Sequence, residues 1–202
     1  MEKYNRILVV DGLNNYMRAY AANPTMSTNG VHVGGIVGFL KILQKMMREV
    51  KPTRVVIAWD GDGGSKKRKQ INKDYKLGRK PIRLNRNHGF ATEDQEKQGR
   101  LRQQLRLIEY FNYTPIRQII ADGVEADDLI SWVCQSHVCD DWQKVILSND
   151  KDFFQILDAC TVLIRPSSDK PLTIRSVIDE YGIHPTNFAL ARAMSGDRSD
   201  NL

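Results

Sequence analysis

The sequence is poor in cysteine and has no long apolar run. Its 202 residues include three cysteines (Cys134, Cys139 and Cys160), an odd number without metal-ligand spacing. This favours a reducing cytoplasm over a disulfide framework or a zinc site. No apolar stretch approaches the roughly 20 residues that a membrane-spanning helix needs, so no membrane association is expected. The apolar run at Arg6–Val10 is followed by Asp11 rather than by the small residues of a signal-peptide cleavage site, and it predicts a buried strand.

Basic residues are concentrated in one part of the chain. The sequence has 30 lysines and arginines against 24 acidic residues, a net charge of +6. Between Lys66 and Arg106 there are fourteen basic and four acidic residues, which leaves 16 basic and 20 acidic residues elsewhere. A basic segment on a slightly acidic body suits the binding of a phosphodiester close to an acidic metal site.

Strand and helix patterns alternate along the sequence. Buried strands are predicted at Arg6–Val10, Arg54–Trp59, Thr114–Ile116, Lys144–Leu147 and Thr161–Arg165. Helices are predicted at Gly34–Val50, Arg100–Phe111 and Val124–His137, with a short helix after Asp150 and two more near the end. From residue 62 to about residue 100, apolar residues are sparse, which indicates an insertion, part helix and part loop. The alternation predicts an α/β domain with a mostly parallel central sheet flanked by helices.

Acidic residues follow the predicted strands. Asp11, Asp60 and Asp150 lie at the carboxyl ends of three strands, where open α/β sheets bind their ligands. Six further acids stand at short spacings in the later part of the chain: Glu125, Asp127, Asp128, Asp152, Asp197 and Asp200. Nine clustered carboxylates need a cationic counter-charge, and oxygen-only ligation favours Mg²⁺ or Mn²⁺ over Zn²⁺. The alternative for each acid is an ordinary turn or helix-cap residue.

Five motifs carry a specific resemblance. ILVVDG, VIAWDGDG, DGVEADDLI, SNDKDFFQ and MSGDRSDNL occur in the order found in the 5′-nuclease family. That family includes phage flap endonucleases and the N-terminal nuclease domains of bacterial repair polymerases. The resemblance covers nearly the whole chain and implies a PIN-like or resolvase-like nuclease core. It also implies 5′-flap endonuclease and 5′-to-3′ exonuclease activity in DNA replication or repair, in the host cytoplasm if the chain is encoded by a phage.

The resemblance also implies roles for the acids. Two metal ions are expected, Mg²⁺ with Mn²⁺ able to substitute, and Asp60 is expected to be essential for catalysis. The residues matched to the first ion are Asp11, Asp60, Glu125 and Asp127, and those matched to the second ion or its water shell are Asp128, Asp150, Asp152, Asp197 and Asp200.

The basic insertion resembles the helical arch of the family, through or under which a single-stranded 5′ end passes. Lys76, in DYKLGRK, matches a position that contacts the scissile phosphate, and Arg68 or its neighbour Lys67 is the second cationic contact. Arg79 and Lys80 are further candidate DNA contacts, although such a run is also typical of a solvated surface.

Two other features are open to two interpretations. Gly34 and Gly35, at the start of a predicted helix, are either a phosphate-binding turn or a plain helix start. Tyr16 either stacks on a terminal base or belongs to the core.

The resemblance implies one catalytic domain over residues 1–202, with the arch at about 62–100 and without the helical duplex-binding region that follows in the family. Three alternatives then stand open: the chain is a truncated piece of a longer protein, another chain supplies that region, or the region is absent. Without it, affinity for duplex DNA is expected to be weak. Flap, nick and free 5′ end all remain candidate substrates, and the pattern indicates no oligomeric state.

Three other classes of protein fit the sequence less well. A PIN-like ribonuclease is usually shorter and has no basic arch. A non-catalytic protein that binds branched DNA gains nothing from nine acids facing phosphate. A haloacid-type phosphatase needs an aspartate at the position of Leu13.

Overall fold

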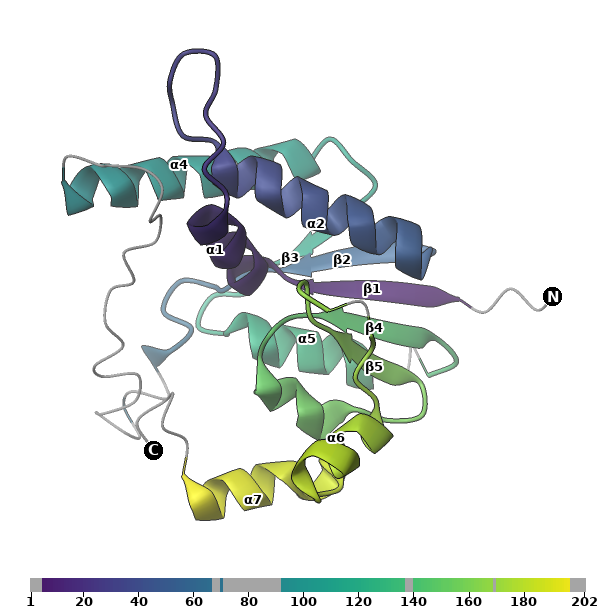
Figure 1. Cartoon of the computed structure of the whole chain (residues 1–202). Coiled ribbons are helices and arrows are strands. Elements are labelled where there is room, and N and C mark those ends of the chain that lie inside the picture. Colours follow the sequence, from purple (N-terminus) through teal and green to yellow (C-terminus); the bar gives the residue numbers. More distant parts are fainter. Residues whose placement is uncertain (1–4, 67–69, 71–91, 137–139, 169, 197–202) are drawn as a thin grey trace.

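Five parallel strands form a single sheet in this computed structural model, which describes residues 5–66, 70, 92–136, 140–168 and 170–196 (Figure 1). The strands are β1 (Arg6–Asp11), β2 (Arg54–Ala58), β3 (Arg117–Ile119), β4 (Gln143–Leu147) and β5 (Thr161–Ile164). Their order across the sheet is β3-β2-β1-β4-β5, so β1 lies in the middle and pairs with both β2 and β4. The predicted α/β fold with a parallel central sheet is confirmed.

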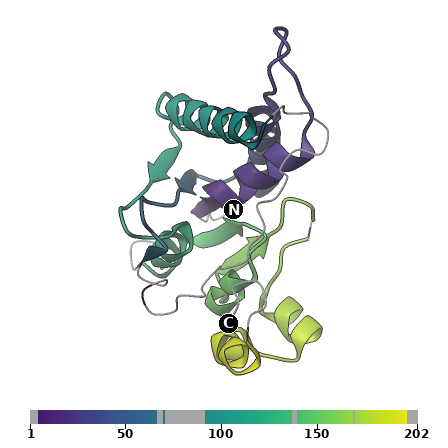
Figure 2. The ribbon, with the colours of Figure 1, turned by 90° about the vertical axis from the view of Figure 1, so that its left-hand side faces the viewer.

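Helices cover both faces of the sheet (Figures 1 and 2). The helices on one face are α1 (Gly12–Ala22), α2 (Gly34–Val50) and α4 (Glu93–Phe111). The elements on the other face are α5 (Ala126–Gln135), the 3₁₀ helix η2 (Lys151–Ile156), α6 (Ile174–Tyr181), the 3₁₀ helix η3 (Pro185–Asn187) and α7 (Phe188–Ser195). In the described part of the chain, none of these helices has the length and apolar content that crossing a bilayer requires.

The central strand explains the unbroken apolar run near the N-terminus. Leu8 and Val10 pack with α1 and α2, whereas Ile7 and Val9 pack with α5 and η2, and all four side chains are buried. A strand covered by helices on both faces needs apolar residues at every position rather than at alternate ones. Burial of β1 thus fixes the position of Asp11, its last residue.

Two helices differ from the sequence prediction. Helix α4 begins at Glu93 rather than near Arg100, because the Thr92 side chain accepts the backbone N–H of Gln95 and three acids occupy the first turn. Its first turns bury no apolar side chain, so hydrophobic periodicity does not reveal them. Helix α1 was not predicted, since glycine and two asparagines in its first turn disfavour a helix by propensity alone.

The predicted boundaries of two other elements were also wrong. The strand expected at Thr114–Ile116 is β3 at Arg117–Ile119, because the Thr114 amide and hydroxyl both donate to the Phe111 carbonyl in a turn. Pairing with β2 then begins at Arg117. Helix α5 begins at Ala126 rather than at Val124 and ends at Gln135.

Candidate active site

Three carboxylates meet at the carboxyl edge of the sheet. Asp11 ends β1, Asp60 follows β2, and Asp150 follows β4. Because β1 pairs with both β2 and β4, these three acids come from adjacent strands. The negative charges of Asp60 and Asp150 both raise the pKa of Asp11, so the three groups interact electrostatically. The structure therefore brings together the three strand-end acids that the sequence pattern singles out.

Asp11 is buried, with only 8% of its surface exposed. One carboxylate oxygen accepts the backbone N–H of Asn14 at 3.1 Å, and the other accepts the hydroxyl of Ser148 at 2.8 Å. The pKa of Asp11 is raised from its ordinary value of 3.8 to about 7. Burial is the largest cause, the charges of Asp60 and Asp150 add to it, and the two hydrogen bonds act in the opposite direction. A cation at this edge would reverse that effect and keep Asp11 ionised at neutral pH.

Each of the three strand-end acids also accepts a backbone amide at the start of a helix. Asp11 accepts that of Asn14 in α1, Asp60 Oδ1 that of Ala126 in α5 at 2.8 Å, and Asp150 Oδ1 that of Asp152 in η2 at 3.0 Å. Helix capping is therefore a real function of these residues. It leaves oxygen lone pairs for a second ligand, so capping and metal binding are compatible.

Three more of the predicted ligands lie at the start of helix α5. Glu125, 7% exposed, precedes the helix, and Asp127 and Asp128 lie in its first turn. The Asp127 carboxylate accepts the backbone N–H of Asp128 at 2.8 Å. The contact between Asp60 and the amide of Ala126 brings this helix start next to the end of β2.

Asp152 has a cationic partner. Its carboxylate lies 2.7 Å from the guanidinium of Arg192 on α7, with both side chains partly exposed. Arg192 also borders a cavity of about 610 Å³, whose other polar lining residues include Asn14, Asn149, Asp150 and Lys151. Space for a polar ligand thus adjoins the carboxylate edge.

The remaining predicted site residues lie outside the described part of the chain. They are the acids Asp197 and Asp200 and the basic residues Lys67, Arg68, Lys76, Arg79 and Lys80.

The described side chains at this edge have the donor chemistry of a metal site, although they do not form a complete one. Within the described ranges, no three His, Cys, Asp or Glu side chains form a ready-made metal-binding group. The groups near Asp11 are nevertheless carboxylates, which suit hard cations such as Mg²⁺ and Mn²⁺. Burial of a carboxylate beside two others also fits a site that gains a cation. The chemistry of the donors therefore fits the implied metal.

Two buried polar residues at this edge were not predicted. Asn15 is fully buried, and its amide nitrogen donates to the carbonyls of Asp11 at 2.7 Å and of Leu147 at 2.8 Å. Ser148 is fully buried and lies between Asp11 and Asp150. Neither residue belongs to a periodic pattern, and the one available signal is that each lies next to a strand-end acid. Together they tie the ends of β1 and β4 to each other.

The structure bears on the two features that the sequence left open to two interpretations. The amide of Gly35, at the buried start of α2, donates to the Gln103 side chain at 2.9 Å, and Gly34 is buried as well. This geometry argues against phosphate binding through the Gly35 amide. Tyr16 is fully buried, and its hydroxyl donates to the Arg100 carbonyl at 2.5 Å. Tyr16 is therefore a core residue, and the stacking interpretation is wrong.

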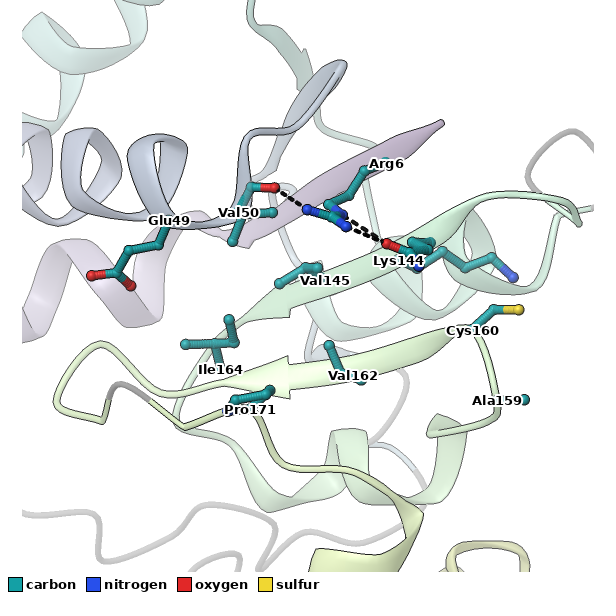
Figure 3. Close-up of a pocket in the computed structure, with 11 residues that line it drawn as sticks. Arg6, Glu49, Val50, Lys144, Val145, Ala159, Cys160, Val162, Ile164 and Pro171 are labelled. Atoms are coloured by element: carbon teal, nitrogen blue, oxygen red, sulfur yellow. Dashed lines mark hydrogen bonds between the residues drawn. The ribbon is translucent and has the colours of Figure 1, made fainter. Parts of the chain in front are cut away.

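A second cavity, of about 350 Å³, lies over β4 and β5 beside the end of α2 (Figure 3). It is mostly apolar, with Val145, Val162 and Ile164 among its lining residues. Its arginine, Arg6, is engaged in hydrogen bonds to the Gln143 side chain and the Val50 carbonyl. None of the residues that line it is one of the acids at the carboxyl edge of the sheet.

An all-parallel α/β domain with acids along the carboxyl edge of its sheet has the architecture of a resolvase-like nuclease domain. The family model described as "5'-3' exonuclease, N-terminal resolvase-like domain" matches residues 6–182, and the chain belongs to that family. The predicted membership in the 5′-nuclease family is confirmed.

Curated relatives are longer than this chain. It is 30% identical over 209 residues to DNA polymerase I of Bacillus subtilis, covering 100% of this chain and 22% of the polymerase. It is 27% identical over 198 residues to a 5'-3' exonuclease of Aquifex aeolicus, covering 97% of this chain and 63% of that protein. The chain thus spans about a fifth of the polymerase and less than two thirds of the exonuclease.

The fold is also similar to that of a solved enzyme. The bacteriophage T5 flap endonuclease, in a complex with DNA and metal ions, superimposes with a TM-score of 0.76 at 16% identity. The similarity covers 98% of this chain and 68% of that one, and it supports the fold described above.

Proposed function

We propose that the chain is a divalent-metal-dependent nuclease that hydrolyses phosphodiesters near the 5′ end of branched or nicked DNA. The observation that carries the proposal is the position of buried Asp11 between Asp60 and Asp150 at the carboxyl edge of a family-matched sheet. The name of the Aquifex relative and the DNA complex of the phage enzyme support a DNA substrate. A 5′ flap, a nick and a free 5′ end are the proposed substrates.

The proposed cofactor is a pair of Mg²⁺ ions, with Mn²⁺ able to substitute. The residues proposed to hold one ion are Asp11, Asp60, Glu125 and Asp127, and those proposed for the other are Asp128, Asp150, Asp152, Asp197 and Asp200. When bound, such ions supply an activated water and stabilise charge on the attacking and leaving oxygens.

Other groups of the protein hold and orient the carboxylates of the proposed site. Two hydrogen bonds fix both oxygens of Asp11, and the amide of Ala126 fixes one oxygen of Asp60. Fixed carboxylates lower the reorganisation that a reacting phosphate would otherwise require.

The basic insertion at about residues 62–100 of this 1–202 catalytic domain is proposed to bind the DNA. Lys76 and either Arg68 or Lys67 would contact the reacting phosphate, and Arg79 and Lys80 would contact neighbouring phosphates.

Cleavage of an end-labelled 5′-flap DNA with Mg²⁺ or Mn²⁺, by the wild type and Asp60→Asn, tests the proposal. An asparagine keeps an oxygen for the Ala126 amide, so the fold should survive while cleavage falls by more than about 100-fold, beyond the usual range for outer-shell changes. Asp141→Asn, an exposed acid just before β4 at the opposite edge of the sheet, is the matched control and should cleave like the wild type.

Three outcomes would contradict the proposal. Equal cleavage by Asp60→Asn would remove Asp60 from the site. Metal-independent binding of flap DNA without cleavage would favour a non-catalytic DNA-binding protein. Cleavage of RNA but not of flap DNA would favour a PIN-like ribonuclease.

A further inference from the structure

Ser148 connects two strand-end acids through a single hydroxyl group. Its side chain is fully buried, directly after β4. The Oγ atom lies 2.8 Å from Oδ2 of Asp11, and it also lies 3.1 Å from the backbone nitrogen of Asp150. The two acids are far apart in sequence, and this hydroxyl links them across the boundary between β1 and β4.

The direction of both hydrogen bonds follows from the chemistry of the groups. The amide of Asp150 can only donate, so Ser148 Oγ accepts there. The hydroxyl proton is then free to go to the carboxylate of Asp11, which is an acceptor when ionised. One serine thus accepts from one acid's backbone and donates to the other acid's side chain.

No other side chain in the described ranges makes this link. The remaining hydrogen bond to the Asp11 carboxylate comes from the backbone of Asn14 on the adjoining helix. Asn15 joins the same two strands, but through the carbonyls of Asp11 and Leu147 rather than through a carboxylate. Asn15 therefore fixes the strand ends, whereas Ser148 fixes the orientation of the Asp11 carboxylate relative to the Asp150 loop.

We propose that Ser148 is a positioning residue of the metal site, whose hydroxyl holds the carboxylate of Asp11 in register with the loop that carries Asp150. This inference rests on the proposed function, because it assumes that Asp11 and Asp150 bind cations. Hydrogen bonds to ligating carboxylates orient the ligands, and their loss typically weakens metal affinity by about 10- to 100-fold. Ser148 acts through Asp11 and needs no contact with DNA.

The test is calorimetric titration of the full chain with Mn²⁺ alone, without DNA, for the wild type and three variants at residue 148. Ser148→Ala removes the hydroxyl, and Ser148→Cys keeps most of the volume but has a weak donor. Both should raise the Mn²⁺ dissociation constant by about 10- to 100-fold. Ser148→Thr keeps the hydroxyl and should recover affinity to within a few-fold of the wild type.

Ser176→Ala is the matched control. Ser176 takes part in the capping box of α6, so its loss lowers stability without touching the carboxylate edge. A reduced melting temperature with wild-type Mn²⁺ affinity in this control separates positioning from general destabilisation. The Cys variant keeps the test usable if Ser148→Ala does not fold.

The outcomes separate the two proposals. Wild-type protein that binds Mn²⁺ and cleaves flap DNA, together with Ala and Cys variants that bind Mn²⁺ as tightly as wild type, would overturn the role of Ser148 alone. A Thr variant as weak as the folded Ala variant would also overturn it, because the hydroxyl would then be irrelevant. Wild-type protein that binds no Mn²⁺ would overturn the proposed function and this inference with it.

Discussion

Replacement of Asp11 by asparagine is expected to stabilise the metal-free protein at alkaline pH. Asp11 is buried, and its pKa is raised from 3.8 to about 7, chiefly by that burial. The folded state therefore binds the proton more tightly than the unfolded state does. Protonated Asp11 therefore contributes to the free energy of unfolding. This contribution is complete below the pKa of Asp11 in the unfolded state, and it is lost as the pH rises through about 7. Asparagine stays neutral throughout and does not suffer this loss.

The size of this change in the free energy of unfolding follows from the raised pKa of Asp11. Each pKa unit corresponds to about 1.4 kcal/mol, and about two units separate pH 5 from the folded pKa of Asp11. The free energy of unfolding of Asp11→Asn, relative to wild type, should therefore rise by about 3 kcal/mol between about pH 5 and about pH 8.5. The same histidines titrate in both proteins, so they cancel in this difference.

Urea denaturation in the presence of EDTA, followed at both pH values, measures this difference. Added Mn²⁺ should stabilise the wild type at the higher pH more than it stabilises the variant, because the asparagine cannot supply the charged ligand. The reasoning is refuted if the difference between the two proteins is the same at both pH values, since Asp11 would then not titrate in this window.

Three further changes have expected outcomes. Gln103→Leu leaves two backbone amides at the start of α2 without their acceptor and should lower the free energy of unfolding by about 2–4 kcal/mol in urea, whereas the exposed Gln98→Leu on the same helix should not. Gly61→Ala would place a methyl group 1.7 Å from a backbone oxygen, so a large fall in melting temperature is expected, and a wild-type melting curve would contradict the close approach. Arg192→Ala removes a partly exposed ion pair with Asp152 and should cost less than about 1 kcal/mol in urea; a larger loss would mean that the pair is more than a surface contact.

The sequence predicts the sheet well because β1, β2 and β4 are buried on both faces. Continuous apolar runs then mark their positions, and Asp11, Asp60 and Asp150 follow directly. The start of α4 is less predictable, because a polar cap and acidic first turn stabilise it without any apolar pattern. The turn at Thr114 shifts β3 through local hydrogen bonds that propensity does not report.

The acids of the candidate site were predictable from their places after the strands, but the groups that hold them were not. Ser148 and Asn15 act through contacts with residues more than a hundred positions away, at 2.8 Å in both cases. Such pairs become visible only when β1 and β4 are known to be neighbours. A distant contact also changes the interpretation of Gly34 and Gly35. The Gly35 amide donates to the side chain of Gln103, which argues against the phosphate-binding turn that the local sequence suggested.

The capping of helix starts by Asp11, Asp60 and Asp150 has a consequence for how this domain tolerates change. A capping residue needs an oxygen that accepts an amide, not a negative charge, and asparagine caps about as well as aspartate. Single amide replacements at these positions should therefore leave the fold intact and, under the proposed function, would remove a charged metal ligand. A folded but inactive protein is then one substitution away, and a screen that reports only on solubility or abundance would not detect it.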